Sequence, residues 1–164
     1  LAIGYLVSWL GPVLECDDLY DGQSTLSPLL DAIVHVQNIV FLKRDNFTDN
    51  DGIKRAIMDY GGVFTGIKMQ HKLVQYISYQ TSPDHAICIV GWDDDFNVRG
   101  APGNGAWICK NSWGSNWGDN GFFYISYYDT TCAKVGVSDA SFAFVFNDTL
   151  RYDKTIVTAT KQSQ

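Results

Sequence analysis

The sequence has no region of excess positive charge and no long apolar run. Its 164 residues include 12 lysines and arginines against 18 aspartates and glutamates, a formal net charge of −6. Nucleic-acid binding needs clustered basic side chains to neutralise phosphates, so that function is not expected. The longest apolar stretch, residues 33–42, contains His35, Gln37 and Asn38. It is far shorter than the roughly 18 apolar residues of a membrane-spanning helix, so no membrane span is expected.

Cysteine is scarce too. Cys16, Cys88, Cys109 and Cys132 are too few for a disulfide-rich scaffold at this length, and no Cys-x-x-Cys pair predicts a zinc site. Cys88 and Cys109 are expected to face opposite sides of neighbouring strands, so no disulfide is expected between them. The three histidines lack carboxylates at metal-ligand spacing. We therefore predict no metal site.

The segment Asp93-x-Asp95-x-Asn97 imitates the beginning of a calcium-binding loop. Val98 stands at the sixth position, where such a loop needs glycine, and Asn104 stands at the twelfth, where a bidentate glutamate is expected. A solvated hairpin turn is the better interpretation.

Aromatic residues (14%) and the 15 glycines are abundant, which is typical of a β-rich fold with tight turns. One helix is also predicted, with Asp49 or Asn50 as its cap and Gly61 at its end. Its helically spaced apolar face is predicted to consist of Ile53, Ala56, Ile57 and Tyr60.

Short segments rich in β-branched and aromatic residues lie between turn-forming residues and predict strands. These segments are 33–42, 63–69, 73–79, 85–92, 106–111 and 122–128. The last turns of another helix are predicted at 2–9, followed by a polar connection at 16–28. Five or six antiparallel strands with one helix predict a partly open barrel or a sandwich.

Two segments carry residues suited to catalysis. The sequence Asp-His-Ala-Ile-Cys at 84–88 begins one predicted strand, and Asn-Ser-Trp-Gly at 111–114 begins where the next strand ends. If the strands form a hairpin that pairs His85 with Asn111, the amide oxygen accepts from one ring nitrogen. That bond fixes the tautomer and leaves the other nitrogen for a nucleophile.

This pair resembles the histidine and asparagine of the papain and cathepsin superfamily of cysteine peptidases. The stretch from Asn-Ser-Trp-Gly to Trp-Gly-Asp-Asn-Gly, residues 111–121, is that family's most recognisable feature. Gly-Pro-Val after the first helix, the acidic connection and Gly-Trp-Asp-Asp at 91–94 resemble its bacterial and archaeal secreted branch. The resemblance runs from about Ile3 to Phe146.

The resemblance implies an α+β, papain-like fold, mainly the β-rich, barrel-like lobe with a remnant of the helical lobe. Residues 1–30 would be the helical remnant and connection, and 31–150 the β-rich lobe. Residues 151–164 would be a linker or the start of a following module.

The resemblance also implies hydrolysis of peptide bonds by a Cys-His-Asn acyl-enzyme mechanism. His85 would act as general base and acid, Asn111 would orient it, and Trp113 would shield their hydrogen bond from water. No cofactor is implied, and the expected partner is a protein or peptide substrate.

By the same resemblance, Gly66, Pro83 and Ala86 would line the pocket for the second residue before the scissile bond. Small residues leave room there, so bulky apolar or aromatic substrate side chains are expected.

The nucleophile is not expected within this chain. In the family the cysteine precedes the histidine by roughly 130 to 150 residues, which places it about 50 residues before Leu1. The chain starts without Met or a signal sequence. We therefore expect a piece of a longer protein, inactive alone, whose partner is the missing N-terminal helical lobe. Cys16 is unsuitable, because Glu15, Asp17 and Asp18 surround it and negative charge disfavours a thiolate.

Two other functions stay open. The chain could belong to a nucleophile-lacking binding or adhesion module, or to an acyl-transfer enzyme with the same thiol chemistry. The resemblance also implies a secreted or cell-surface location. His35 and His71 are predicted to be ordinary surface or strand residues, and Trp117 a core aromatic.

Overall fold

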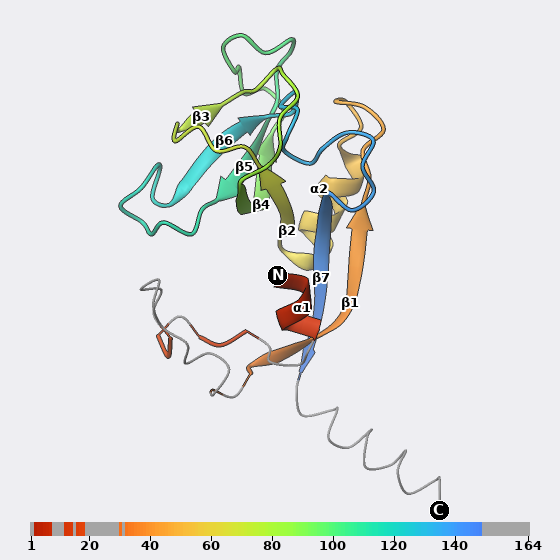
Figure 1. The fold of residues 1–164 in the computed structure, drawn as a ribbon, viewed down its shortest axis with the longest axis vertical. Coiled ribbons are helices and arrows are strands. Elements are labelled where there is room, and N and C mark those ends of the chain that lie inside the picture. Colours follow the sequence, from red (N-terminus) through yellow and green to blue (C-terminus); the bar gives the residue numbers. More distant parts are fainter. Residues whose placement is uncertain (1, 8–11, 15, 19–29, 31, 149–164) are drawn as a thin grey trace, which may run out of the picture. The chain divides into compact units, whose positions relative to one another are not determined.

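One seven-stranded sheet dominates the computed structural model, which describes residues 2–7, 12–14, 16–18, 30 and 32–148 (Figure 1). Within that part the elements in chain order are α1 (Ala2–Val7), β1 (Val34–Leu42), α2 (Asp51–Tyr60), β2 (Val63–Ile67), β3 (Val74–Gln75), β4 (His85–Asp93), β5 (Ala106–Lys110), β6 (Phe122–Ser126) and β7 (Ser141–Asp148). Most of the predicted polar connection and the predicted segment 151–164 lie outside the described residues.

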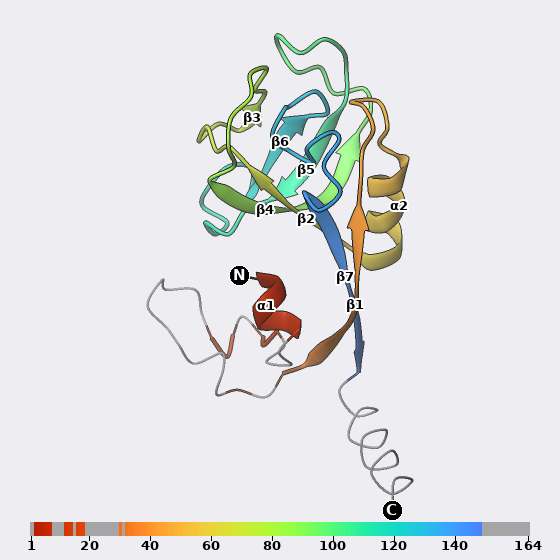
Figure 2. The ribbon, with the colours of Figure 1, turned by 45° about the vertical axis from the view of Figure 1, so that its right-hand side comes forward.

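The strands follow the order β1-β7-β2-β4-β5-β6-β3, and Figure 2 shows the same neighbours from another side. The described residues form a single sheet instead of the two of a sandwich, so that alternative is wrong. β4 is antiparallel to both β2 and β5, while β3 runs parallel to β6, contrary to the all-antiparallel prediction. β4 therefore lies inside the sheet, where hydrogen bonds on both sides fix its position.

The chain divides into two compact units. The first combines residues 1–39 with 145–164, and the second is Val40–Phe144. In the first unit the amide of Ile33 donates to the carbonyl of Pro12 at 3.0 Å. Every residue of the candidate site described below belongs to the second unit.

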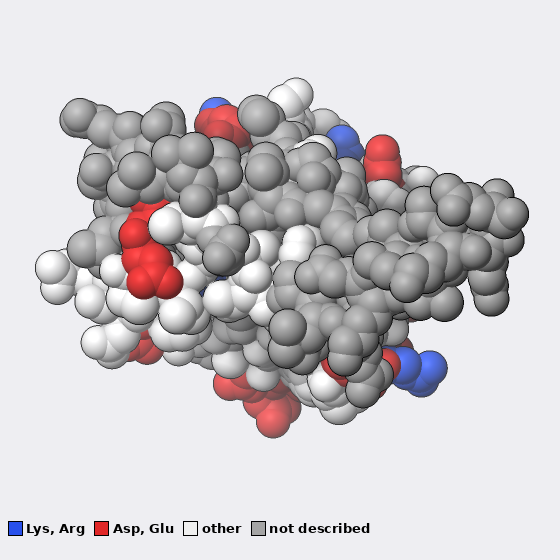
Figure 3. Space-filling model, turned by 90° about the horizontal axis from the view of Figure 1, so that it is seen from below, with Lys and Arg blue, Asp and Glu red and all other residues white. Residues whose placement is uncertain are grey.

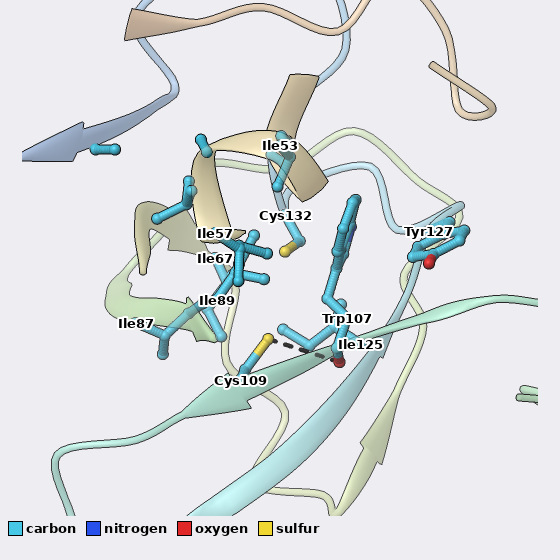
Figure 4. Close-up of a cluster of buried hydrophobic side chains, with 14 of the residues drawn as sticks. Ile53, Ile57, Ile67, Ile87, Ile89, Trp107, Cys109, Ile125, Tyr127 and Cys132 are labelled. Atoms are coloured by element: carbon cyan, nitrogen blue, oxygen red, sulfur yellow. Dashed lines mark hydrogen bonds between the residues drawn. The ribbon is translucent and has the colours of Figure 1, made fainter. Parts of the chain in front are cut away.

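Helix α2 packs its apolar side on strands β2 and β4. Ile53, Ala56 and Ile57 are buried, and Figure 4 shows Ile57 beside Ile67 of the sheet. Burial of each such isoleucine contributes roughly 1.5–3 kcal/mol. The rest of this core consists of Val63, Ile67, Ile87, Ile89, Trp107, Cys109, Phe123, Ile125, Tyr127, Cys132, Ala133 and Ala143.

The ends of α2 agree with the prediction only in part. Gly61 ends the helix at φ 86°, and its amide donates to the carbonyl of Ile57 at 2.8 Å. Asn50 is the N-terminal cap residue, but its side chain makes no capping hydrogen bond. Its Oδ1 instead accepts from Arg44 at 2.6 Å, and Asp49 accepts from the amide of Asp45. The predicted side-chain cap is wrong, because a buried guanidinium takes the amide oxygen.

The buried side chain of Arg44 links several loops by hydrogen bonds. It is only 2% exposed and lies 5.6 Å from the centre of the Trp107 ring. Burial lowers the pKa of Arg44 from its ordinary value. Its acceptors are Asn50 Oδ1 and the carbonyls of Phe47, Asp49, Tyr127 and Ala133. A buried polar group costs free energy unless it is hydrogen-bonded, and these five acceptors satisfy the guanidinium.

Two strands differ from the predicted set. The strand predicted at 73–79 shortens to Val74–Gln75, because the amide of Ile77 donates to the Asp129 carboxylate and the carbonyl of Ile77 accepts from Thr130. Strand β7 was not predicted, although Phe142, Phe144 and Phe146 alternate at strand spacing.

Candidate active site

His85 is the first residue of β4, and the sheet fixes its backbone. It pairs with Ile67 of β2 and is half-buried. The preceding residue, Asp84, donates its amide to the Ile67 carbonyl at 2.9 Å. The Asp84 carboxylate accepts from Lys68 Nζ at 2.5 Å and from the Met69 amide at 2.9 Å. The Lys68 hydrogen bond is the main cause that lowers the pKa of Asp84.

Asn111 lies within hydrogen-bond distance of this histidine. His85 Nε2 and Asn111 Oδ1 are 2.8 Å apart, and Asn111 is only 4% exposed. The same oxygen accepts from the Ser112 amide at 2.9 Å. The backbone N–H of Ser112 can only donate, so the side-chain atom of Asn111 that faces it must be the oxygen and not the nitrogen. An oxygen can only accept, so His85 Nε2 must carry the proton of the second hydrogen bond. The arrangement leaves Nδ1 as the nitrogen available to a reacting group.

The register that produces this contact differs from the predicted one. Cys88 pairs with Lys110, the last residue of β5. Continued past the strand end, this register sets Asn111 opposite Ile87. His85 and Ile87 lie on the same face because side chains alternate along a strand, so the contact is diagonal. The predicted contact is present, but the predicted direct pairing is wrong.

Glycines allow the turn after Asn111 to close. Gly118 has φ 63°, and a Cβ there would lie 2.4 Å from the carbonyl oxygen of Phe122. Gly121 has φ 88°, and its carbonyl accepts from the Asn111 amide at 2.9 Å. Left-handed backbone without a Cβ at these positions returns the turn to β6 and anchors the backbone of Asn111.

Trp113 packs next to the histidine. Its ring centre is 4.9 Å from that of His85, with the planes tilted by 39°. Trp117 meets Trp113 edge-on at 5.0 Å and packs in turn on the buried Phe123 at 5.3 Å. Trp117 joins the margin of the core, as predicted. The chain of rings connects Trp113 to the core.

His71 makes a contact that the sequence does not predict. The residue is exposed, as predicted, but its ring stacks on Trp113 with 5.0 Å between ring centres and 14° between planes. Its backbone adopts a left-handed conformation with φ 55°. No periodic pattern links residue 71 to residue 113, so only the folded chain reveals this neighbour.

The three small residues predicted to line a substrate pocket lie together. Gly66 pairs with Ala86 across β2 and β4. A Cβ on Gly66 would lie 3.2 Å from Pro83 Cβ, so Pro83 stands directly beside this pair. Pro83 and Ala86 are exposed. These three neighbouring positions therefore carry no bulky side chain.

The four cysteines are all free thiols, as expected for Cys88 and Cys109. Cys109 and Cys132 are buried, and burial raises the pKa of Cys109. Burial also raises the pKa of Cys88, three residues from His85 and on the opposite strand face. Cys16 belongs to the other unit, where its Sγ lies 3.8 Å from the Asp17 carboxylate.

The acidic segment after β4 forms the connection to β5. The Asp95 amide donates to Asp93 Oδ1 at 2.9 Å, and Asn97 bonds to Asn104 at 3.0 Å, as in a polar hairpin turn.

Across the described ranges, no group of three or more His, Cys, Asp or Glu could hold a metal ion, and no helix is long and apolar enough to cross a membrane. Acidic side chains gather at separate places on the described surface in Figure 3.

A comparison with protein families matches residues 20–143 to the model for papain family cysteine proteases. The chain belongs to the papain family. The match includes β2, β4 and β5, and with them both His85 and Asn111. The observed sheet with one packed helix is the β-rich lobe of the papain-like fold.

Solved and curated relatives agree with this assignment. The structure of the cysteine protease and lectin-like domains of Cwp84, a surface layer associated protein of Clostridium difficile, matches with a TM-score of 0.74 and 30% identity over 90% of this chain. The viral cathepsin of Heliothis zea nuclear polyhedrosis virus is 36% identical over 86% of the chain. Serine-repeat antigen protein 5 of Plasmodium falciparum (isolate 3D7) is 36% identical over 48% of it.

The papain-family chain spans only part of these relatives. It covers 36% of the Cwp84 chain, 38% of the viral cathepsin and 9% of the serine-repeat antigen.

Proposed function

We propose that this chain supplies the histidine and asparagine of a peptidase that hydrolyses peptide bonds through a Cys-His-Asn acyl-enzyme mechanism. The observation that carries the proposal is the 2.8 Å contact between His85 Nε2 and Asn111 Oδ1, with the oxygen also fixed by the Ser112 amide. Two donors on one buried oxygen hold the imidazole in one tautomer and leave Nδ1 to exchange a proton with a thiol.

The proposed reaction has two stages, acylation of the thiol and hydrolysis of the thioester. A thiolate beside His85 Nδ1 attacks the peptide carbonyl carbon and forms a tetrahedral intermediate. The imidazolium gives its Nδ1 proton to the amine as the C–N bond breaks, which leaves a thioester. His85 next takes a proton from water as the water oxygen attacks the thioester, and the thiolate departs.

The thiol in this proposal is none of the four in this chain. Cys109 and Cys132 are buried, and the pKa of Cys88 is raised by burial, so thiolate formation is disfavoured at Cys88 and Cys109. Cys16 lies against the carboxylate of Asp17. The nucleophile would belong to a helical lobe that precedes this chain, and the chain alone would be inactive.

The surface at Gly66, Pro83 and Ala86 is proposed to receive the second substrate residue before the scissile bond. A Cβ is absent from Gly66 and the other two side chains are small, so a bulky apolar or aromatic substrate side chain fits best. Similarity to a surface layer associated protein supports a secreted or cell-surface location.

Labelling the complete protein tests the source of the thiol. A peptide carrying a thiol-reactive epoxide is added, and the modified residue is located by mass spectrometry. The proposal expects one modified cysteine that is none of the four in this chain, together with loss of peptide hydrolysis. Modification of Cys16 alone, or hydrolysis that survives full labelling, would contradict it.

A binding or adhesion module without the nucleophile is the second candidate. It is supported by the four cysteines of this chain, none of which suits a nucleophile: Cys109 and Cys132 are buried, burial raises the pKa of Cys88, and Cys16 lies against a carboxylate. This candidate expects no cysteine to be labelled and no peptide to be hydrolysed by the complete protein, while peptide binding remains.

A further inference from the structure

We propose that His71 is a positioning residue that holds Trp113 against the hydrogen bond between His85 and Asn111. This inference rests on the proposed function, because it concerns the same histidine and asparagine. It adds a residue from the connection between β2 and β3 that takes no part in the proposed chemistry.

The first support is the continuity of ring contacts. The rings of His71 and His85 both contact Trp113, at 5.0 and 4.9 Å between ring centres. Only the His71 ring is close to parallel with the indole, at 14°. Stacked aromatic pairs attract each other beyond the area that they bury, so the stacked His71 ring restrains the indole.

The second support is the fixed position of the loop that carries His71. The amide of Gln70 donates to Oε1 of the fully buried Gln75, and the Gln75 amide nitrogen donates to the Lys68 carbonyl. The Met69 amide donates to the Asp84 carboxylate. These bonds join the loop to the residue that precedes His85 in the chain.

The third support is the backbone of His71 itself. Its φ of 55° lies in the left-handed region, which non-glycine residues adopt uncommonly. In this conformation the exposed imidazole stacks on Trp113. Loss of the ring would leave Trp113 less restrained, and water would then reach the bond between His85 and Asn111 more easily.

The test uses the complete protein with three substitutions. His71→Asn removes the ring, but asparagine tolerates the left-handed conformation, so backbone strain is not the cause of any effect. His71→Phe keeps a planar ring without an ionisable nitrogen. Lys72→Ala is the matched control, because Lys72 is the next exposed residue of the same loop.

Two readouts are measured for each variant. One is the exchange of the His85 Nε2 proton with water, followed by NMR of histidine labelled with nitrogen-15. The other is kcat and KM for a peptide substrate. His71→Asn should speed the exchange and lower kcat, each by about three- to tenfold, with KM within twofold. His71→Phe should restore both, and Lys72→Ala should change neither.

The outcomes separate this proposal from the peptidase proposal. Exchange and kcat within twofold of the unsubstituted protein in His71→Asn would overturn the role of His71, as would equal loss in His71→Asn and His71→Phe. If the unsubstituted protein hydrolyses no peptide, the peptidase proposal fails. The proton exchange then still decides whether His71 holds Trp113.

Discussion

Asn111 contacts His85 diagonally across the end of two strands, not from the position directly opposite. β5 ends at Lys110, opposite Cys88, and the next residue directs its amide oxygen to His85 Nε2 at 2.8 Å. Because Asn111 has left the strand, the Ser112 amide is free to donate to the same oxygen. The end of the strand thus supplies the second donor that fixes the orientation of the amide.

Replacement of Asn111 by Ala should lower kcat of the complete protein by about 100-fold, less than the loss of the general base itself. The substitution removes the acceptor of the Nε2 proton but leaves the imidazole in place. Steady-state hydrolysis of a peptide measures the effect. Asn116→Ala, in the same turn and exposed, is the control, and an equal loss in both variants would contradict a role specific to Asn111.

Two substrates are compared, one with a bulky aromatic residue and one with Ala at the second position before the scissile bond. Replacement of Gly66 by Ala should reduce cleavage of the aromatic substrate by about tenfold more than cleavage of the other. The added Cβ would lie 3.2 Å from Pro83 Cβ and leave less room for a large substrate side chain. The ratio of the two kcat/KM values measures this selectivity. Gly52→Ala is the control, because its Cβ meets nothing within 4 Å. An unchanged ratio in Gly66→Ala would remove this surface from substrate binding.

Replacement of Arg44 by Met should destabilise the complete protein by at least about 3 kcal/mol, because several buried carbonyls lose their donor. Urea unfolding, compared through the free energy extrapolated to water, measures the loss. Arg55→Met, on the exposed side of α2, should stay within about 0.5 kcal/mol. If Arg44→Met lowers the free energy of unfolding by less than about 1 kcal/mol, the loss equals about one hydrogen bond. That result would contradict the prediction, because it would show that water replaces the guanidinium as the donor to these carbonyls.

The ion pair between Asp84 and Lys68 should break as the pH falls into the acid range. The folded state lowers the pKa of Asp84, chiefly through Lys68. The ionised carboxylate therefore stabilises the fold above the ordinary Asp pKa, and this contribution disappears as pH falls through the lowered value. The Met69 amide signal in NMR should shift over that range, and Asp84→Asn should abolish the shift. Asp139→Asn is the control and should leave the shift of the Met69 signal unchanged. A shift that persists in Asp84→Asn would assign the titration to another group.

Much of the fold and of the candidate site was predictable where the signal is local. The alternation before Trp92 predicts β4, the helical spacing around Ile53 predicts α2, and the glycine-rich turn after Asn111 identifies the family. The alternating phenylalanines of β7 are an equally local signal, and they too are typical of a strand.

Features that depend on distant partners were not predictable. The capping oxygen of Asn50 is occupied by Arg44, and the extended segment after Gln75 bonds to the Asp129 turn instead of to a strand. The stacking of His71 on Trp113 joins two loops that no pattern connects. In each case the partner is chosen by burial and hydrogen bonding in the folded chain, which local propensity does not encode.

The most direct test of the account is peptide hydrolysis by the complete protein with His85 replaced by Ala, against Asn116→Ala, an exposed residue of the turn after Asn111, as the control. Proton transfer through the imidazole is the central claim, so kcat/KM should fall by at least about 1,000-fold in His85→Ala and by less than about threefold in the control. Hydrolysis by His85→Ala within about tenfold of the unsubstituted protein would contradict the claim, because a general base alone is worth about 100-fold or more.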